Sequence, residues 1–162
     1  MPARLVPLPL TAERFAPFGD VIEDVRAGTV PMNDARFERF GALCNLDTDG
    51  ETDIGIVRCR TATSLPVHVD MVERHPLGSQ AFVPLDGQRF LVAVAEPGAP
   101  PERLHAFVSN GRQGVNYRRG TWHMPLIGLE TGQRFLVIDR QTLATNCDTH
   151  KLAEPVLLEL AK

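Results

Sequence analysis

The sequence lacks the features that define several large classes of protein. It contains no run of lysine or arginine, and its 17 basic residues stand against 20 acidic ones, for a formal charge of −3. A nucleic-acid-binding surface would need a basic patch. No apolar run approaches the roughly 20 residues of a membrane-spanning helix. Glycine-rich phosphate loops of the G-x-G-x-x-G or Walker type are also missing. We therefore expect no nucleic-acid partner, no membrane association and no nucleotide cofactor.

Cysteine is scarce. Cys44, Cys59 and Cys147 are odd in number, widely separated and outside any C-x-x-C spacing, which argues against a disulfide framework and a zinc knuckle. The first ten residues, MPARLVPLPL, contain three prolines and no continuous apolar segment of the kind found in signal peptides. These features predict a cytoplasmic protein.

Glycine and proline, by contrast, are plentiful, with 13 of each in 162 residues. They cut the chain into short apolar pieces, a pattern that leaves little room for long helices and favours strands joined by turns. The predicted strands cover residues 54–59, 65–73, 81–84, 90–95, 106–108, 115–119, 135–138 and 156–160. Near the start, Thr11 can cap a short helix over 12–18 that stops at Gly19. The expectation is one all-β domain over 1–162, a sandwich or barrel with one or two short helices.

The segment 65–87 carries the first candidate chemistry. Side chains alternate along a strand, so Val67, Val69 and Met71 should share one face with Glu73 and His75. Burying a carboxylate and an imidazole on a core face costs free energy unless the two groups are paired or bind a metal. The alternative is that the strand has reached the rim of a barrel, where Glu73 simply pairs with Arg74 or another arginine.

Two spacings in the chain resemble the signatures of the cupin superfamily. From Glu73 to Gly87 the pattern is E-x-H-x4-Q-x6-G, with Glu73 where the first histidine is usual and Gln80 where the glutamate is usual. The second signature ends in P-x-G-x-x-H, and here Gly120 and His123 keep their places while Arg118 replaces the proline. The resemblance implies a cupin-like double-stranded β-helix barrel.

The same resemblance implies a metal site formed by Glu73, His75, Gln80 and His123. Imidazole and oxygen ligands together suit divalent nickel, manganese, iron or zinc, and we take Ni²⁺ as the first expectation, with Mn²⁺ or Zn²⁺ as alternatives. His123 also has a structural interpretation, as a packing residue beside Trp122.

Longer stretches resemble the ureidoglycolate lyase family nearly from end to end. The clearest stretches are 71–85 and 114–126, supported by Arg39-Phe40 and by 54–58, 138–140 and 146–148. Membership would imply a homodimer that cleaves (S)-ureidoglycolate to glyoxylate and urea in allantoin breakdown. One departure is that several members have two consecutive histidines where this chain has His123-Met124.

This resemblance, combined with the chemistry of the reaction, assigns roles to individual residues. Elimination requires a base for the substrate hydroxyl and a proton donor for the departing nitrogen. Glu73 or His75 is the candidate base and Tyr117 the candidate donor. Arg119 or Arg39 could clamp the substrate carboxylate. Two other functions remain open: a different metal-dependent cupin enzyme, an isomerase or dioxygenase acting on a small carboxylate, and a non-catalytic cupin that binds a small acid.

Overall fold

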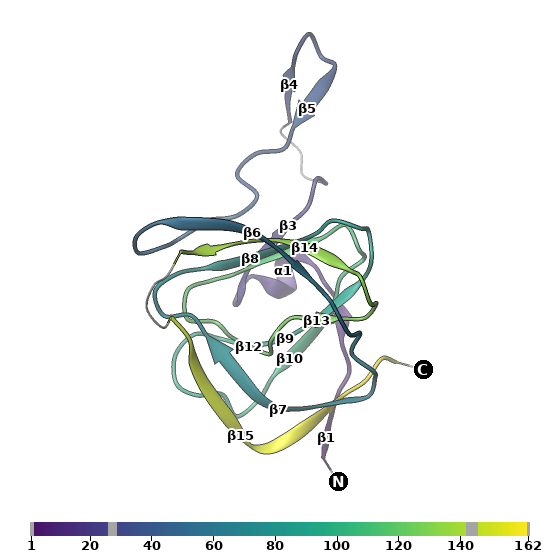
Figure 1. Cartoon of the computed structure of the whole chain (residues 1–162), viewed down its shortest axis with the longest axis vertical. Helices are drawn as coiled ribbons and strands as arrows, with labels where there is room; N and C mark the ends of the chain where they lie inside the picture. Colours follow the sequence, from purple (N-terminus) through teal and green to yellow (C-terminus); the bar gives the residue numbers. More distant parts are fainter. Residues whose placement is uncertain (1, 26–28, 142–145, 162) are drawn as a thin grey trace.

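The computed structural model describes residues 2–25, 29–141 and 146–161, and most of its regular structure consists of β-strands in two sheets (Figure 1). The larger sheet has eight strands, in the order β1-β15-β7-β12-β9-β10-β2, with β13 also paired to β9. Its strands are β1 (Ala3–Leu5), β2 (Leu8–Pro9), β7 (Val67–Arg74), β9 (Phe90–Ala95), β10 (His105–Val108), β12 (Trp122–His123), β13 (Ile127–Gly128) and β15 (Asp148–Leu158). The smaller sheet has the order β3-β11-β8-β14-β6. Its strands are β3 (Gly19–Ile22), β6 (Thr52–Arg58), β8 (Gln80–Pro84), β11 (Gly114–Tyr117) and β14 (Arg134–Arg140).

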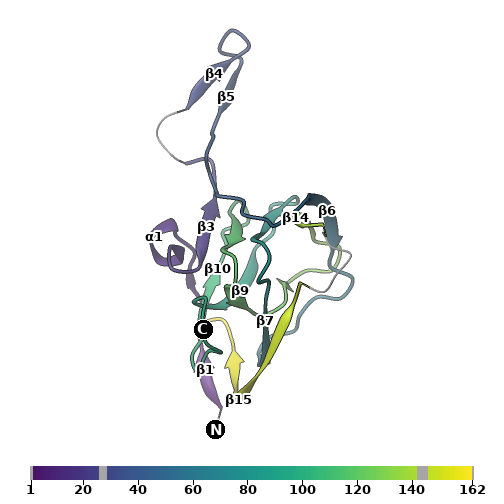
Figure 2. The same ribbon diagram turned by 90° about the vertical axis from the view of Figure 1, so that its left-hand side faces the viewer.

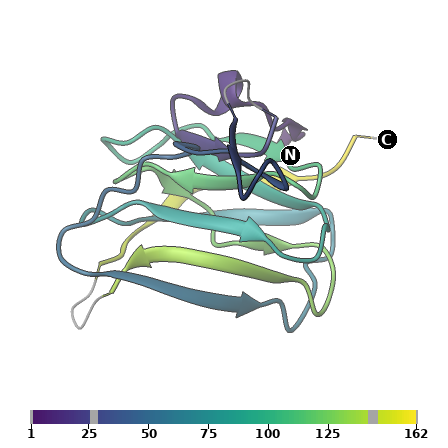
Figure 3. The same ribbon diagram turned by 90° about the horizontal axis from the view of Figure 1, so that it is seen from above.

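The two sheets enclose the main core. In Figure 1 the smaller sheet lies above β9, β10 and β12, and β7 and β15 curl beneath them; Figure 3 shows the strands of the smaller sheet from above. The core between the sheets is rich in aromatic side chains: Phe15, Phe18, Phe82, Phe90, Phe107, Tyr117 and Phe135. A second apolar cluster, which includes Val69, Val72, Leu91, Trp122 and Leu158, fills the space inside the curl of the larger sheet. This architecture confirms the expected all-β, cupin-like barrel.

The helix is shorter than the sequence predicts. It is α1 (Ala12–Phe15), rather than 12–18, and the side chain of Thr11 caps it by accepting a hydrogen bond from the N–H of Arg14 at 3.3 Å. Pro17 has no N–H to continue the helical ladder, so the helix ends before it. No helix in the described part of the chain is long and apolar enough to cross a bilayer.

The alternation predicted for the strand that carries Glu73 is wrong. Val69 and Val72 of β7 both join the second apolar cluster although they are three residues apart, and Glu73 therefore faces the opposite side. On the neighbouring strand, the register with β7 shifts between Lys151 and Val156. Such a bulge changes which side chains share a face. β15 begins at Asp148, well before the predicted 156–160.

A hairpin of β4 (Val30–Met32) and β5 (Phe37–Arg39) projects away from the barrel (Figures 1 and 2). All six of its strand residues are exposed, and the sequence pattern did not predict it. The turn between the strands runs through Asn33, Asp34 and Ala35, which all have positive φ. An alanine in this conformation is not a turn signal that a sequence pattern reveals.

We predict that Gly19→Ala destabilises the fold strongly. Gly19 pairs with Tyr117 at the start of β3 and has φ +155°, and an added Cβ would lie 1.8 Å from the backbone oxygen of Asn116. We expect a loss of about 3 kcal/mol in the free energy of unfolding, measured by chemical denaturation. The matched control is Gly132→Ala, where φ is also positive but nothing lies within 4 Å of the new Cβ. Equal losses in both variants would contradict the steric explanation.

Candidate active site

Three of the four predicted metal ligands come together inside the barrel. Glu73, near the end of β7, lies directly opposite His123 of β12 in the sheet register, and His75 follows just beyond the end of β7. One ligand atom from each residue lies within 4.8 Å of the others. The imidazole rings of His75 and His123 are 5.1 Å apart between centroids. Neighbouring strands thus supply two ligands, and the chain beyond β7 supplies the third.

Backbone carbonyls orient both imidazoles. Nδ1 of His75 lies 2.6 Å from the carbonyl oxygen of Asn146, and Nδ1 of His123 lies 3.0 Å from that of Thr121. A carbonyl oxygen can only accept, so we assign the ring hydrogen to Nδ1 in both residues. Each Nε2 atom then carries a free lone pair. Both Nε2 atoms are buried and have no hydrogen-bond partner.

The three residues therefore present acceptors to one another without a donor between them. Oε1 of Glu73 lies 3.5 Å from Nε2 of His123, which is too long for a good hydrogen bond. Two imidazole nitrogens and a carboxylate are a ligand set that binds divalent transition metals, and a cation at their centre would satisfy all three. The cluster fits a divalent metal ion.

The simple salt bridge between Glu73 and Arg74 is not formed. Arg74 points to the other side of β7, where its Nε donates to Asp148 at 2.9 Å and its guanidinium lies 4.5 Å from the centre of the Trp122 ring. Glu73 instead keeps its charge inside the barrel. When His123 is protonated, its contact lowers the pKa of Glu73 most, whereas burial acts in the opposite direction.

His123 packs against Tyr117 and not against its sequence neighbour Trp122. The rings of Tyr117 and His123 stack at 4.3 Å and 14°, and the side chain of Trp122 belongs to the second cluster on the other face of β12. The hydroxyl of Tyr117 is buried and has no hydrogen-bond partner. Burial, and secondly the charge of Glu73, raise the pKa of Tyr117, so the phenol keeps its proton.

Gln80, the fourth predicted ligand, begins β8 directly opposite Tyr117 in the register of β8 and β11. Paired residues on neighbouring strands lie on the same face of a sheet, so Gln80 shares the face that carries Tyr117. Its side-chain amide donates to the carboxylate of Asp139 at 3.1 Å. A role for its carbonyl oxygen as a ligand stays a prediction.

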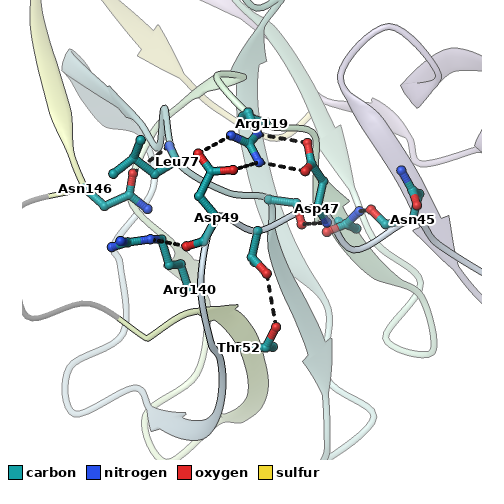
Figure 4. A network of polar contacts seen from close by, with 11 residues as sticks. Asn45, Asp47, Asp49, Thr52, Leu77, Arg119, Arg140 and Asn146 are labelled. Carbon is teal, nitrogen blue, oxygen red and sulfur yellow. Dashed lines mark hydrogen bonds and ion pairs between the residues drawn. The ribbon is translucent and has the colours of Figure 1, made fainter.

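The two predicted carboxylate-binding arginines lie elsewhere. Arg119 makes four hydrogen bonds of 2.7–2.9 Å to the carboxylates of Asp47 and Asp49, which occupy most of its donor groups (Figure 4). Arg39 is an exposed residue of β5 in the projecting hairpin. Neither residue is part of the cluster of Glu73 and the two histidines.

Sequence reasoning missed two residues that contact the cluster. Asn146 holds the His75 ring through its backbone oxygen, and Sγ of Cys147 lies 3.5 Å from Oε2 of Glu73. Burial first, and then the charge of Glu73, raise the pKa of Cys147 to about 11. These contacts join positions more than 70 residues apart in the chain, so no local spacing could have indicated them. The resemblance of 146–148 to family sequences was the only signal that pointed to them.

The barrel and its cluster of two histidines, each with a buried Nε2 atom, and one carboxylate define a cupin-like protein with a candidate metal-dependent active site. The family model described as "Ureidoglycolate lyase" matches residues 2–159. The chain therefore belongs to the ureidoglycolate lyase family, a family of enzymes of the lyase class.

Curated relatives that are named ureidoglycolate lyase agree with this assignment. The chain is 48% identical to the protein of Pseudomonas syringae pv. syringae over 161 residues, which cover 97% of this chain and 95% of the relative. It is 48% identical to the Azotobacter vinelandii protein over 150 residues, or 90% of each chain. It is 47% identical to a Pseudomonas putida protein over 156 residues, which cover 94% of this chain and 93% of the relative.

We predict that His123→Ala removes divalent-metal binding and leaves the protein folded. The variant lacks one of the three converging acceptors, so Ni²⁺ affinity measured by calorimetry on metal-free protein should fall at least 100-fold. Losing the stack on Tyr117 should lower the free energy of unfolding by only about 1–2 kcal/mol. His68→Ala, an exposed histidine on the same strand as Glu73, is the control and should bind metal normally. Complete unfolding of His123→Ala would instead indicate a structural role.

Proposed function

We propose that this protein cleaves (S)-ureidoglycolate to glyoxylate and urea by a metal-assisted elimination. The observation that carries the proposal is the convergence of Oε1 of Glu73 with the free Nε2 atoms of His75 and His123. The substrate follows from the names of the relatives. We also propose that the whole chain forms one domain, in the cytoplasm, where its three unpaired cysteines would stay reduced.

In this reaction the carbon–nitrogen bond of the substrate breaks, and its hydroxyl becomes the carbonyl of glyoxylate. The hydroxyl proton goes to a base, and a proton must reach the departing urea nitrogen. A divalent ion held by His75, His123 and Glu73 would lower the pKa of the hydroxyl and stabilise the forming carbonyl oxygen. We propose Glu73 or His75 as the base, and whichever of the two takes the proton does not hold the ion at that step.

Tyr117 is the proposed donor to the urea nitrogen. Its hydroxyl is buried without a protein partner, and its raised pKa keeps it protonated. A group that holds its proton so firmly acts best as a hydrogen-bond donor that passes the proton only as negative charge develops on the nitrogen. The stack of Tyr117 on His123 would fix the position of the donor relative to the reacting atoms.

The metal and the carboxylate-binding residue complete the proposal. We propose Ni²⁺ as the ion, with Mn²⁺ or Zn²⁺ as alternatives, and Gln80 as a further oxygen ligand. Arg119 and Arg39 remain our candidates for the substrate carboxylate. Arg119 would first have to release Asp47 or Asp49, so we consider it more important for anchoring the segment that contains these aspartates.

One observation favours a second candidate function. Two histidines and one carboxylate form the ligand set of non-haem Fe(II) oxygenases, and Glu73, His75 and His123 provide that set. A dioxygenase acting on a small carboxylate would consume oxygen, whereas an elimination would not. Oxygen uptake with Fe(II)-loaded protein therefore separates the two functions.

We predict that metal-loaded protein releases urea and glyoxylate in equal amounts from (S)-ureidoglycolate, and that removing the metal abolishes the release. Glu73→Gln keeps the shape of the side chain and removes its charge, so it should lower kcat at least 100-fold. The measurement is glyoxylate formation with added Ni²⁺, Mn²⁺ or Zn²⁺. An absence of turnover with every metal would refute the proposed function.

We also propose that the protein is a homodimer and that the projecting hairpin takes part in the interface. Val30, Met32 and Phe37 of the hairpin are exposed, as are Ile54 and Ile56 of β6. The hairpin and β6 lie at the same end of the molecule in both Figure 1 and Figure 2. Apolar surface gathered in this way is typical of sites that another protein covers.

For this interface we predict that the double variant Phe37→Ser/Ile56→Ser is a monomer. Light scattering after gel filtration should give twice the chain mass of 17.9 kDa for the unaltered protein and the single mass for the variant. The control, Val6→Ser, replaces an exposed valine outside this surface and should leave the dimer intact. A dimer that survives the double substitution would place the interface elsewhere.

A further inference from the structure

Three consecutive residues, the last of which begins β15, contact the segment that carries Glu73 and His75. Asn146 accepts from His75 Nδ1 through its backbone oxygen, and its side-chain oxygen accepts from the N–H of Leu77 at 2.8 Å (Figure 4). Cys147 Sγ contacts Oε2 of Glu73 at 3.5 Å. Asp148 accepts from Arg74 and is paired with it in the β7–β15 register.

We propose that Asn146 and Cys147 are positioning residues that hold His75 and Glu73 in the geometry that binds the metal. The proposal concerns residues outside the cluster itself and rests on the metal-assisted function proposed above. Partners of this kind are as much a part of a metal site as its ligands, because they fix the rotation and the hydrogen position of each ligand.

Asn146 acts on His75 in two ways. Its backbone oxygen accepts a hydrogen bond from Nδ1, which leaves the Nε2 lone pair free to bind a metal. The side-chain oxygen of Asn146 also accepts a hydrogen bond from the N–H of Leu77, two positions beyond His75. The side-chain bond therefore keeps the carbonyl in place, and its loss should let the His75 ring turn.

Cys147 acts on the carboxylate of Glu73. The two oxygens of this carboxylate have different neighbours, because Oε1 faces His123 at 3.5 Å and Oε2 accepts from the Cys147 thiol at 3.5 Å. One contact on each oxygen fixes the plane of the carboxylate and keeps Oε1 available to the metal. A hydroxyl in place of the thiol would preserve this contact, and a methyl group would not.

The test measures metal binding and needs no substrate. Calorimetry of metal-free protein with Ni²⁺ compares two matched pairs, Cys147→Ala with Cys147→Ser and Asn146→Ala with Asn146→Asp. The alanine variants should bind about 10-fold more weakly or worse, as expected when a partner of a metal ligand is removed. Serine and aspartate keep the donor or acceptor atom and should stay within about threefold of the unaltered protein. Cys44→Ala, a free cysteine not among the contacts of the cluster, should have no effect.

Equal affinities of the alanine variants and the unaltered protein would overturn the proposal. So would a serine or aspartate variant that binds as weakly as its alanine partner, or unaltered protein that binds no Ni²⁺. Thermal unfolding of all variants separates loss of metal affinity from loss of fold. If the pattern of affinities is found but ureidoglycolate is not cleaved, the proposed function fails while the positioning roles stand.

Discussion

The structure around the site depends on one electrostatic constraint, the convergence of three hydrogen-bond acceptors in a partly buried place. A carboxylate and two imidazole lone pairs repel one another when nothing lies between them, and burial strengthens that repulsion. Glu73, His75 and His123 nevertheless meet within 4.8 Å. Backbone carbonyls contact Nδ1 of both rings, and both Nε2 atoms are buried without a hydrogen-bond partner. The fold therefore holds in place an arrangement that a cation would stabilise.

The rest of the barrel supplies the rigidity that this arrangement needs. Two of the ligands lie on strands, and each has a neighbour in the chain that is fixed on the opposite face of the strand. Arg74 follows Glu73, and Trp122 precedes His123. Arg74 lies over the Trp122 ring and donates to Gly98, whose carbonyl also accepts from the Trp122 indole. Neighbouring strands are thus clamped on their outer faces while their inner faces carry the ligands. Side chains held on strands in this way are more precisely placed than side chains on loops.

The sequence allowed the fold class and the central cluster to be predicted, because both depend on short-range patterns. Turn residues at close intervals indicated strands, and the spacing of the two signatures picked out Glu73, His75 and His123. The face on which Glu73 lies was predicted wrongly, because β7 departs from strict alternation between Val69 and Val72. Two further contacts could not be predicted because they join residues 70 or more positions apart in the chain. They are the contact of Cys147 with Glu73 and the pairing of Arg119 with Asp47 and Asp49.

The two signatures, weak when taken singly, are joined by hydrogen bonds in the folded chain. The N–H of Gly120 donates to the carbonyl of His75 at 3.0 Å, and Gly120 has φ +76°, a conformation that glycine adopts without strain. The side chain of the adjacent Arg119 donates to the carboxylate of Asp47. The backbone carbonyl of Asp47 accepts a hydrogen bond from the N–H of Ser79, in the turn after His75. Residues just before His123 thus hold both ends of the turn between His75 and Gln80. Gly120 and Arg119 of the second segment thus support the turn of the first, although neither residue is one of the ligands.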